Sequence, residues 1–177
     1  MWKATITKII ALHQNDIWLK GISEKPELTN FGKTHSSLRP LDLWYVAKRN
    51  PLFIREIINT VNIACGNVSQ ALMNAVTDEG AYFKCKLCSK DFEDVSRHFL
   101  LDCHYQMNPR EYMFDKIQDL LHVTHSASLF NQPDEDLYIS LLGGNIPSMK
   151  EDETTEKDNF VTTVATGFMK IILNVLH

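Results

Sequence analysis

The chain has 177 residues, of which 44% are hydrophobic, and this composition suits one ordinary globular domain and excludes a disordered chain. The formal net charge of −4 hides an asymmetry, because residues 1–90 carry 12 Lys and Arg against 7 Asp and Glu, whereas residues 91–177 carry 6 against 15. A weakly basic first half is compatible with a phosphate-binding surface and equally with an ordinary solvated one.

The two ends of the chain indicate an intracellular protein, nuclear or cytoplasmic, with no membrane partner. Residues 1–20 lack the uninterrupted apolar run of a signal peptide and are expected to form a helix. Residues 160–177 are apolar but include Lys170 and Asn174, which are costly at the centre of a bilayer. Because Phe160, Val164 and Phe168 follow helical spacing, this segment is predicted to be an amphipathic helix docked on the protein.

Between the ends, helical patterns alternate with breaks. Residues 21–40 are rich in Gly, Pro, Ser and Thr and are interpreted as a linker. Helices are predicted over residues 42–49 and, with Pro51 in its first turn, over 51–65. Gly66 should end the second of these, and Asn67 is the expected cap of the next.

The second half of the chain continues this helical pattern. Residues 81–87 and those just after Cys88 indicate a short hairpin. A helix is expected to begin at Asn108, with Pro109 in its first position and Glu111 reaching back to the cap. A short helix is predicted over 134–144, and residues 150–158 are interpreted as a solvated tether.

The predicted fold is therefore mainly α, with a small central module in which three cysteines and two histidines lie between residues 85 and 104. Such a cluster indicates a zinc-knuckle-like Cys-Cys-His-Cys module within a helical domain. Three segments are expected: an N-terminal helix and linker at 1–39, a helical domain at 40–145 that contains the module at 82–104, and a tether with a C-terminal helix at 146–177.

The module is predicted from a cluster of cysteine and histidine residues. Its pattern is C-x2-C-x9-H-x4-C, formed by Cys85, Cys88, His98 and Cys103. Three Cys and one His form a common structural zinc site. For this spacing to work, His98 must lie near the end of a short helix and Cys103 where that helix unwinds, because residues five apart on an α-helix point in different directions. Apolar residues that could lie beneath the metal are Phe92, Phe99, Leu100 and Leu101.

Other interpretations of these residues remain open. A Cys-x2-Cys pair is also found in redox proteins, but no strand–helix–strand pattern surrounds this one. His104 is an alternative to Cys103 as the fourth ligand. Cys65 is expected to be a buried thiol, and surface or capping roles are expected for the remaining histidines, which are His13, His35, His122, His125 and His177.

The stretch FKCKLCSKDFEDVSRHFLLDCHYQMNPREYMFDKI resembles the zinc-binding segment that follows the polymerase domain in reverse transcriptases of non-LTR retrotransposons. The matching positions are Cys85, Leu87, Cys88, Glu93, Asp94, His98, Phe99, Leu100, Leu101, Cys103 and Arg110. The resemblance extends over roughly residues 40–145. His104 stands where that family usually has Pro, and no Tyr-x-Asp-Asp polymerase motif occurs in the chain.

This resemblance implies a non-catalytic, zinc-binding C-terminal fragment that assists RNA or DNA binding, beside a polymerase domain in a parent polypeptide. The candidate nucleic-acid contacts are Lys84, Lys86, Lys90 and Arg97. The nearby aromatic residues Tyr82, Phe83 and Phe92 could stack on bases, and Phe83 and Phe92 could instead pack under the metal. The alternative function is a helical protein-interaction module in which zinc is purely structural. A zinc enzyme is not expected, because four protein ligands leave no position for an activated water.

Overall fold

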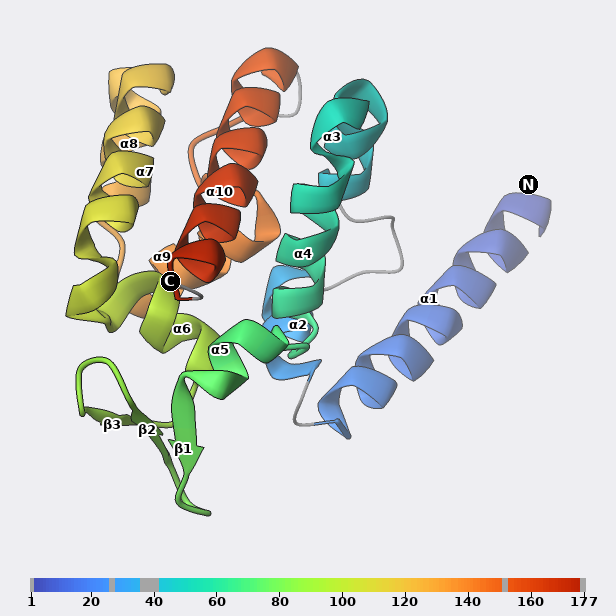
Figure 1. Cartoon of the computed structure of the whole chain (residues 1–177). Helices are drawn as coiled ribbons and strands as arrows, with labels where there is room; N and C mark the ends of the chain where they lie inside the picture. The colour runs from blue at the N-terminus through green and yellow to red at the C-terminus, as the bar shows by residue number, and fades with distance from the viewer. Residues whose placement is uncertain (1, 26–27, 36–41, 151–152, 176–177) are drawn as a thin grey trace.

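The computed structural model of the chain describes residues 2–25, 28–35, 42–150 and 153–175 (Figure 1). It is mainly α-helical, with one small antiparallel sheet below the helices. The predicted fold class is therefore confirmed. Within the described ranges, no helix is both long enough and apolar enough to cross a membrane.

The N-terminal segment is more helical than the sequence suggested. Helix α1 (Trp2–Ser23) is the predicted first helix, and it projects from the helical body in Figure 1. The expected linker is wrong in part, because α2 (Thr29–Thr34) forms within it. Phe31 on α2 packs edge-on against Trp18 of α1, with ring centroids 6.0 Å apart. This tertiary contact stabilises a short helix that has no strong local signal.

The next elements are α3 (Asp42–Arg49), the 3₁₀ turn η2 (Pro51–Phe53), α4 (Ile54–Ala64) and α5 (Gln70–Asn74). The predicted boundaries of α3 are confirmed, and Gly66 follows α4 in the left-handed region at φ 76°. Asn67 is not the cap of α5. The cap is Ser69, whose hydroxyl accepts a hydrogen bond from the Leu72 amide at 3.4 Å.

The sheet has the order β1 (Val76–Asp78), β2 (Phe83–Cys85), β3 (Asp91–Phe92). Strands β2 and β3 form the expected hairpin, with Lys84 opposite Asp91. Strand β1 was not predicted. It pairs antiparallel to β2 with Val76 opposite Cys85, so that it supports the strand carrying the first cysteine.

A run of short turns and helices follows: α6 (Val95–Arg97), one π-helical turn η3 (His98–Asp102), η4 (His104–Gln106), α7 (Met107–Leu120), α8 (Val123–Phe130) and α9 (Asp134–Gly143). The prediction that Asn108 caps α7 is wrong, because η4 leads directly into the helix and Met107 is already helical. Gly144 ends α9 at φ 68°, a conformation that glycine adopts without strain.

Helix α10 (Thr154–Asn174) is the predicted docked C-terminal helix, but it begins inside the segment interpreted as a tether. Residues 151–152 lie outside the described residues. The charged start of α10 is held against α3 by two ion pairs, Lys157 with Asp42 and Arg49 with Asp158. Charges that resembled a solvated tether in the sequence therefore have partners more than a hundred residues away.

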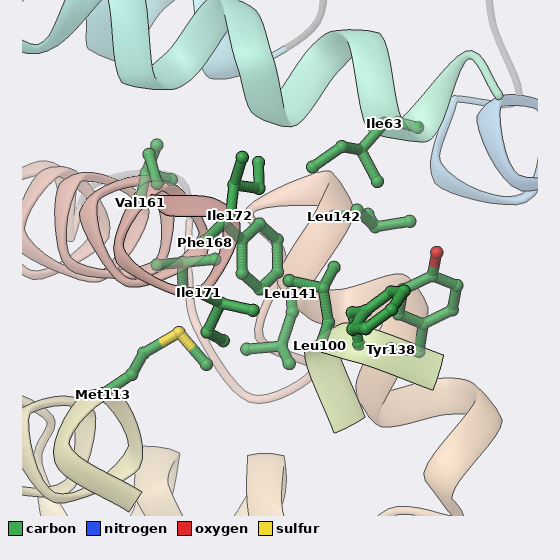
Figure 2. Close-up of a cluster of buried hydrophobic side chains, with 14 of the residues drawn as sticks. Ile63, Leu100, Met113, Tyr138, Leu141, Leu142, Val161, Phe168, Ile171 and Ile172 are labelled. Atoms are coloured by element: carbon green, nitrogen blue, oxygen red, sulfur yellow. The ribbon is translucent and has the colours of Figure 1, made fainter. Parts of the chain in front are cut away.

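The hydrophobic core forms where α10 packs against α4 and α7, with α9 packed against α4. Figure 2 shows side chains from these helices in one cluster, including Ile63, Met113, Leu141 and Phe168. Leu100, from the metal-site turn η3, lies in the same cluster and is fully buried. The candidate metal site is therefore anchored in the main core through the residues that follow His98.

Candidate metal centre

Four donor side chains come together below the helical body. Their ligand atoms all lie within 4.8 Å of one another, and the residues are Cys85, Cys88, His98 and Cys103. Zinc–sulfur bonds of about 2.3 Å and zinc–nitrogen bonds of about 2.0 Å place tetrahedral ligands roughly 3.5–3.8 Å apart. The Cys88 Sγ to His98 Nε2 distance is 3.4 Å, close to this spacing. The group could therefore hold a metal ion with small adjustments.

The first two ligands are positioned by a tight turn at the end of β2. The Cys85 amide donates to the Lys90 carbonyl at 3.0 Å, and the Ser89 amide donates to the Cys85 carbonyl at 2.8 Å. Ser89 adopts φ 61°, and the chain thereby reverses after Cys88. The Cys88 amide also donates to Cys85 Sγ at 3.4 Å, an interaction that favours the thiolate form of Cys85.

The second two ligands are positioned by a π-helical turn. Asp94 caps the preceding helix, because its carboxylate accepts a hydrogen bond from the Arg97 amide at 2.9 Å. The Cys103 amide then donates to the His98 carbonyl at 2.6 Å, the i→i+5 bond of a π-helix. Cys103 itself is extended, at φ −68° and ψ 119°. The expectation that Cys103 lies where the helix unwinds is confirmed, and the π turn makes the five-residue separation workable.

Aromatic side chains fix the orientation of the His98 ring. The Phe92 ring stacks on it with centroids 4.0 Å apart and planes 1° from parallel, and Phe99 meets its edge at 5.2 Å. Phe99 is fully buried, whereas Leu101 is only half-buried. Phe83 stacks on Phe92 at 6.2 Å, so both rings have packing partners beside the site.

Burial favours the uncharged forms of Cys85, His98 and Cys103 when no metal is bound. Desolvation raises the pKa of Cys85 and raises that of Cys103 to about 12. Desolvation, together with the positive charges of Lys90 and Arg110, lowers the pKa of His98 to about 4, so its imidazole is neutral at pH 7. A neutral imidazole can bind a metal directly, while the thiols must release protons as the metal enters.

Arg110 links the site to helix α7. Its guanidinium donates to the Cys103 carbonyl at 3.2 Å. Partial burial lowers its pKa, although the nearby Asp102 and Cys103 act in the opposite direction. His104, the alternative fourth ligand, lies outside the ligand group; it is exposed and its ring contacts Tyr105 at 4.5 Å.

The four basic residues suggested as nucleic-acid contacts lie in different environments. Lys84 and Lys90 are exposed on the β2–β3 hairpin, and the Lys86 ammonium donates to the Asn74 carbonyl at 2.7 Å. Arg97 is half-buried and its guanidinium pairs with Glu135 at 2.9 Å. Arg97 therefore has an internal partner that the sequence did not reveal.

The cysteine and histidine residues outside the site differ in their roles. Cys65 is half-buried, and burial raises its pKa. His13 is exposed, and His122 caps α8 as expected. His177 lies outside the described residues. The surface or capping role expected for His125 is wrong, because this side chain is buried between two carboxylates. They are Glu156, 3.0 Å from its Nδ1, and Glu153, 3.5 Å from its Nε2. In the sequence, the only indication of the contact with His125 was that Glu153 and Glu156 stand three residues apart.

Comparison with protein-family models, with curated proteins and with solved structures finds no match for this chain.

Proposed function

We propose that residues 82–104 bind one structural Zn²⁺ ion and that the chain is a non-catalytic, zinc-stabilised module that contacts RNA or DNA. The observation that supports the zinc assignment is the convergence of three thiols and one imidazole within 4.8 Å, three of the four residues being buried. Thiolates favour zinc over hard cations such as Mg²⁺ or Ca²⁺, and a set of four protein ligands is typical of structural sites.

The surrounding charges support this assignment. Zn²⁺ with three thiolates and a neutral imidazole has a net charge of −1, and burying such a charge is costly without a compensating group. Arg110, which bonds the Cys103 carbonyl, and Lys90, whose charge acts on His98, would offset it. These two residues therefore have a role at the metal itself.

Metal analysis tests the zinc assignment. We expect purified protein to contain about one zinc per chain and Cys85→Ser/Cys88→Ser to contain none. His104→Ala is the matched control and should retain the metal, because His104 is exposed and outside the ligand group. Retention of zinc by the double cysteine variant would show that the metal binds elsewhere.

The nucleic-acid role is supported by the resemblance at residues 83–117 and by the exposed lysines of the hairpin. If Lys84, Lys86 and Lys90 each neutralise one phosphate, log affinity should fall against log salt with a slope of roughly −2 to −3. Arg97 is not expected to contribute to this slope, because its guanidinium pairs with Glu135. The acidic second half of the chain would oppose binding, so the expected dissociation constant near physiological salt is micromolar or weaker.

Titration of labelled single- and double-stranded oligonucleotides at several salt concentrations tests this role. Lys84→Gln should weaken binding and reduce the slope by about 1. Lys48→Gln, an exposed change on α3, is the control and should have little effect. Absence of binding at low salt, or tight binding that ignores salt, would contradict the nucleic-acid role.

A helical protein-interaction module with a structural zinc is the second candidate. It is favoured by large apolar side chains that remain exposed on α1 and at the start of α4. A complex formed through such surfaces would be insensitive to salt, whereas a phosphate contact would not.

A further inference from the structure

Helix α1 exposes an unusual amount of apolar surface. Six of its large side chains are between 40% and 60% exposed, namely Ile6, Ile9, Ile10, Leu12, Ile17 and Leu19. At 3.6 residues per turn, four of them lie within an arc of about 100°. This isoleucine face consists of Ile6, Ile9, Ile10 and Ile17.

The isoleucine face points away from the contact that holds α1 in place. Trp18 and Ile22 lie on the opposite side of the helix, where Trp18 packs on Phe31 and Ile22 is buried. The Ile22 side chain approaches α2 so closely that a Cβ on Gly32 would lie 2.7 Å from it. Among the described residues, the main contact of α1 is therefore with α2, and Figure 1 shows the rest of the helix standing clear of the body.

A second apolar surface lies on the same chain at η2 and the first turns of α4. This η2–α4 patch consists of Leu52, Phe53, Ile54 and Ile58, and Leu52 is 91% exposed. Ile54 and Ile58 are four residues apart on α4 and so share one face. Phe53 also lines a cavity of about 220 Å³ beside Tyr112 and Met113, large enough to admit an aliphatic side chain.

We infer that the two surfaces cover each other in a two-fold dimer, in which α1 of each copy packs on the η2–α4 patch of the other. The eight side chains are between 37% and 91% exposed. If all of them were buried together, the contact would approach the roughly 800 Å² per partner that a stable interface buries. Each copy contributes both surfaces, so a closed two-fold arrangement buries all four and leaves none available for further growth. This inference goes beyond the proposed zinc and nucleic-acid functions and does not depend on them.

Sedimentation equilibrium of the full chain from about 1 to 100 μM tests the dimer. We expect the mass to rise with concentration from 20.3 kDa toward twice that value. Ile9→Asp/Ile17→Asp on the isoleucine face and Leu52→Asp/Ile58→Asp on the patch should each raise the dissociation constant at least about 100-fold, because charges are then buried in an apolar contact. Val123→Asp, at a 73% exposed position outside both surfaces, should dimerise normally. Circular dichroism of each variant should be measured to check that it stays folded.

A mixture of the two double variants tests whether α1 of one copy packs on the η2–α4 patch of the other. In the mixed dimer, the intact α1 of one variant meets the intact patch of the other, so one of the two contacts is preserved and partial dimerisation should return. Normal dimerisation of the patch variant would overturn the proposal and favour α1–α1 pairing. A wild-type chain that stays monomeric at 100 μM would also overturn it, and co-sedimentation with anionic lipid vesicles would then assign α1 to a lipid surface.

Discussion

The helical body and the metal module bury different kinds of side chain. In the body, buried residues such as Ile57, Leu129 and Phe168 are apolar and belong to one hydrophobic core. In residues 82–104, buried positions include two thiols and an imidazole that converge on one point. Buried apolar area supplies most of the stability of the body, whereas the proposed metal would supply much of the stability of the module. Phe99 and Leu100 connect the two regions, because both are fully buried in the shared core.

The largest effect is expected when the metal is removed, because the module and the helical body should then respond differently. Chelation, or Cys85→Ser/Cys88→Ser, should disorder residues 82–104 while most helical circular dichroism remains. Structural zinc contributes about 10–16 kcal/mol in isolated fingers, and partial coupling to the body should still lower Tm by about 10 °C or more. Amide hydrogen exchange would locate the loss in the hairpin and the η3 turn. A collapse of the whole chain to coil would show that the metal organises the body as well.

The body should respond to truncation of its core and leave metal binding intact. Phe168→Ala removes a fully buried ring and should cost about 3–5 kcal/mol of unfolding free energy. Leu173→Ala on the same helix is the control, because Leu173 is exposed and its truncation should cost well under 1 kcal/mol. Urea unfolding measures the cost, and metal analysis of the folded variant should still give one zinc. Loss of zinc from folded Phe168→Ala would show that the two regions are more tightly coupled.

A smaller effect is expected where Gly167 of α10 packs against Met113 of α7. A Cβ at Gly167 would lie 2.3 Å from Met113 Sδ, so Gly167→Ala forces the two helices apart or Met113 into a new rotamer. The expected cost is about 1–3 kcal/mol. Combining it with Met113→Ala should destabilise by less than the sum of the single changes, because the clash is then gone. Strict additivity in urea unfolding would contradict this contact.

The smallest effect concerns the ion pair that secures α10 to α3. Partial burial opposes ionisation of Asp158, but hydrogen bonds from Arg49 and Asn50 outweigh it and hold its pKa below the usual value. This stabilisation is present above the unfolded-state pKa of about 4 and is lost as pH falls through the lower folded-state pKa.

Arg49→Ala should therefore destabilise the chain by about 0.5–1 kcal/mol at pH 7, since Arg49 is partly exposed. The difference from wild type should shrink below about pH 4, as urea unfolding at several pH values would show. Lys116→Ala breaks an exposed pair with Asp119, whose side chains are 49% and 68% accessible, and should have little effect at any pH. A difference between Arg49→Ala and wild type that persists at pH 2 would mean that packing, rather than charge, is lost.

Sequence reasoning succeeded where the signal is local. The boundaries of α3, the hairpin at Cys85 and the unwinding at Cys103 all follow from neighbouring residues. Elements were missed where a contact between residues distant in sequence decides the local structure. Helix α2 forms against Trp18, and strand β1 exists because β2 lies beside it. Cap prediction also failed at Asn67 and Asn108, because other residues start those helices.

The amino-acid sequence by itself determined the mainly helical class and the set of metal donors, because helical periodicity and ligand spacing are properties of short segments. Only the tertiary structure decided which charged side chains pair with one another. It paired Arg97 with Glu135 and Arg49 with Asp158, and it enclosed His125 between two acids. Such pairs join residues about thirty to more than a hundred positions apart, so no local pattern records them. The exposure of the isoleucine face on α1 was likewise decided by tertiary packing, because α2 covers only the opposite side of that helix.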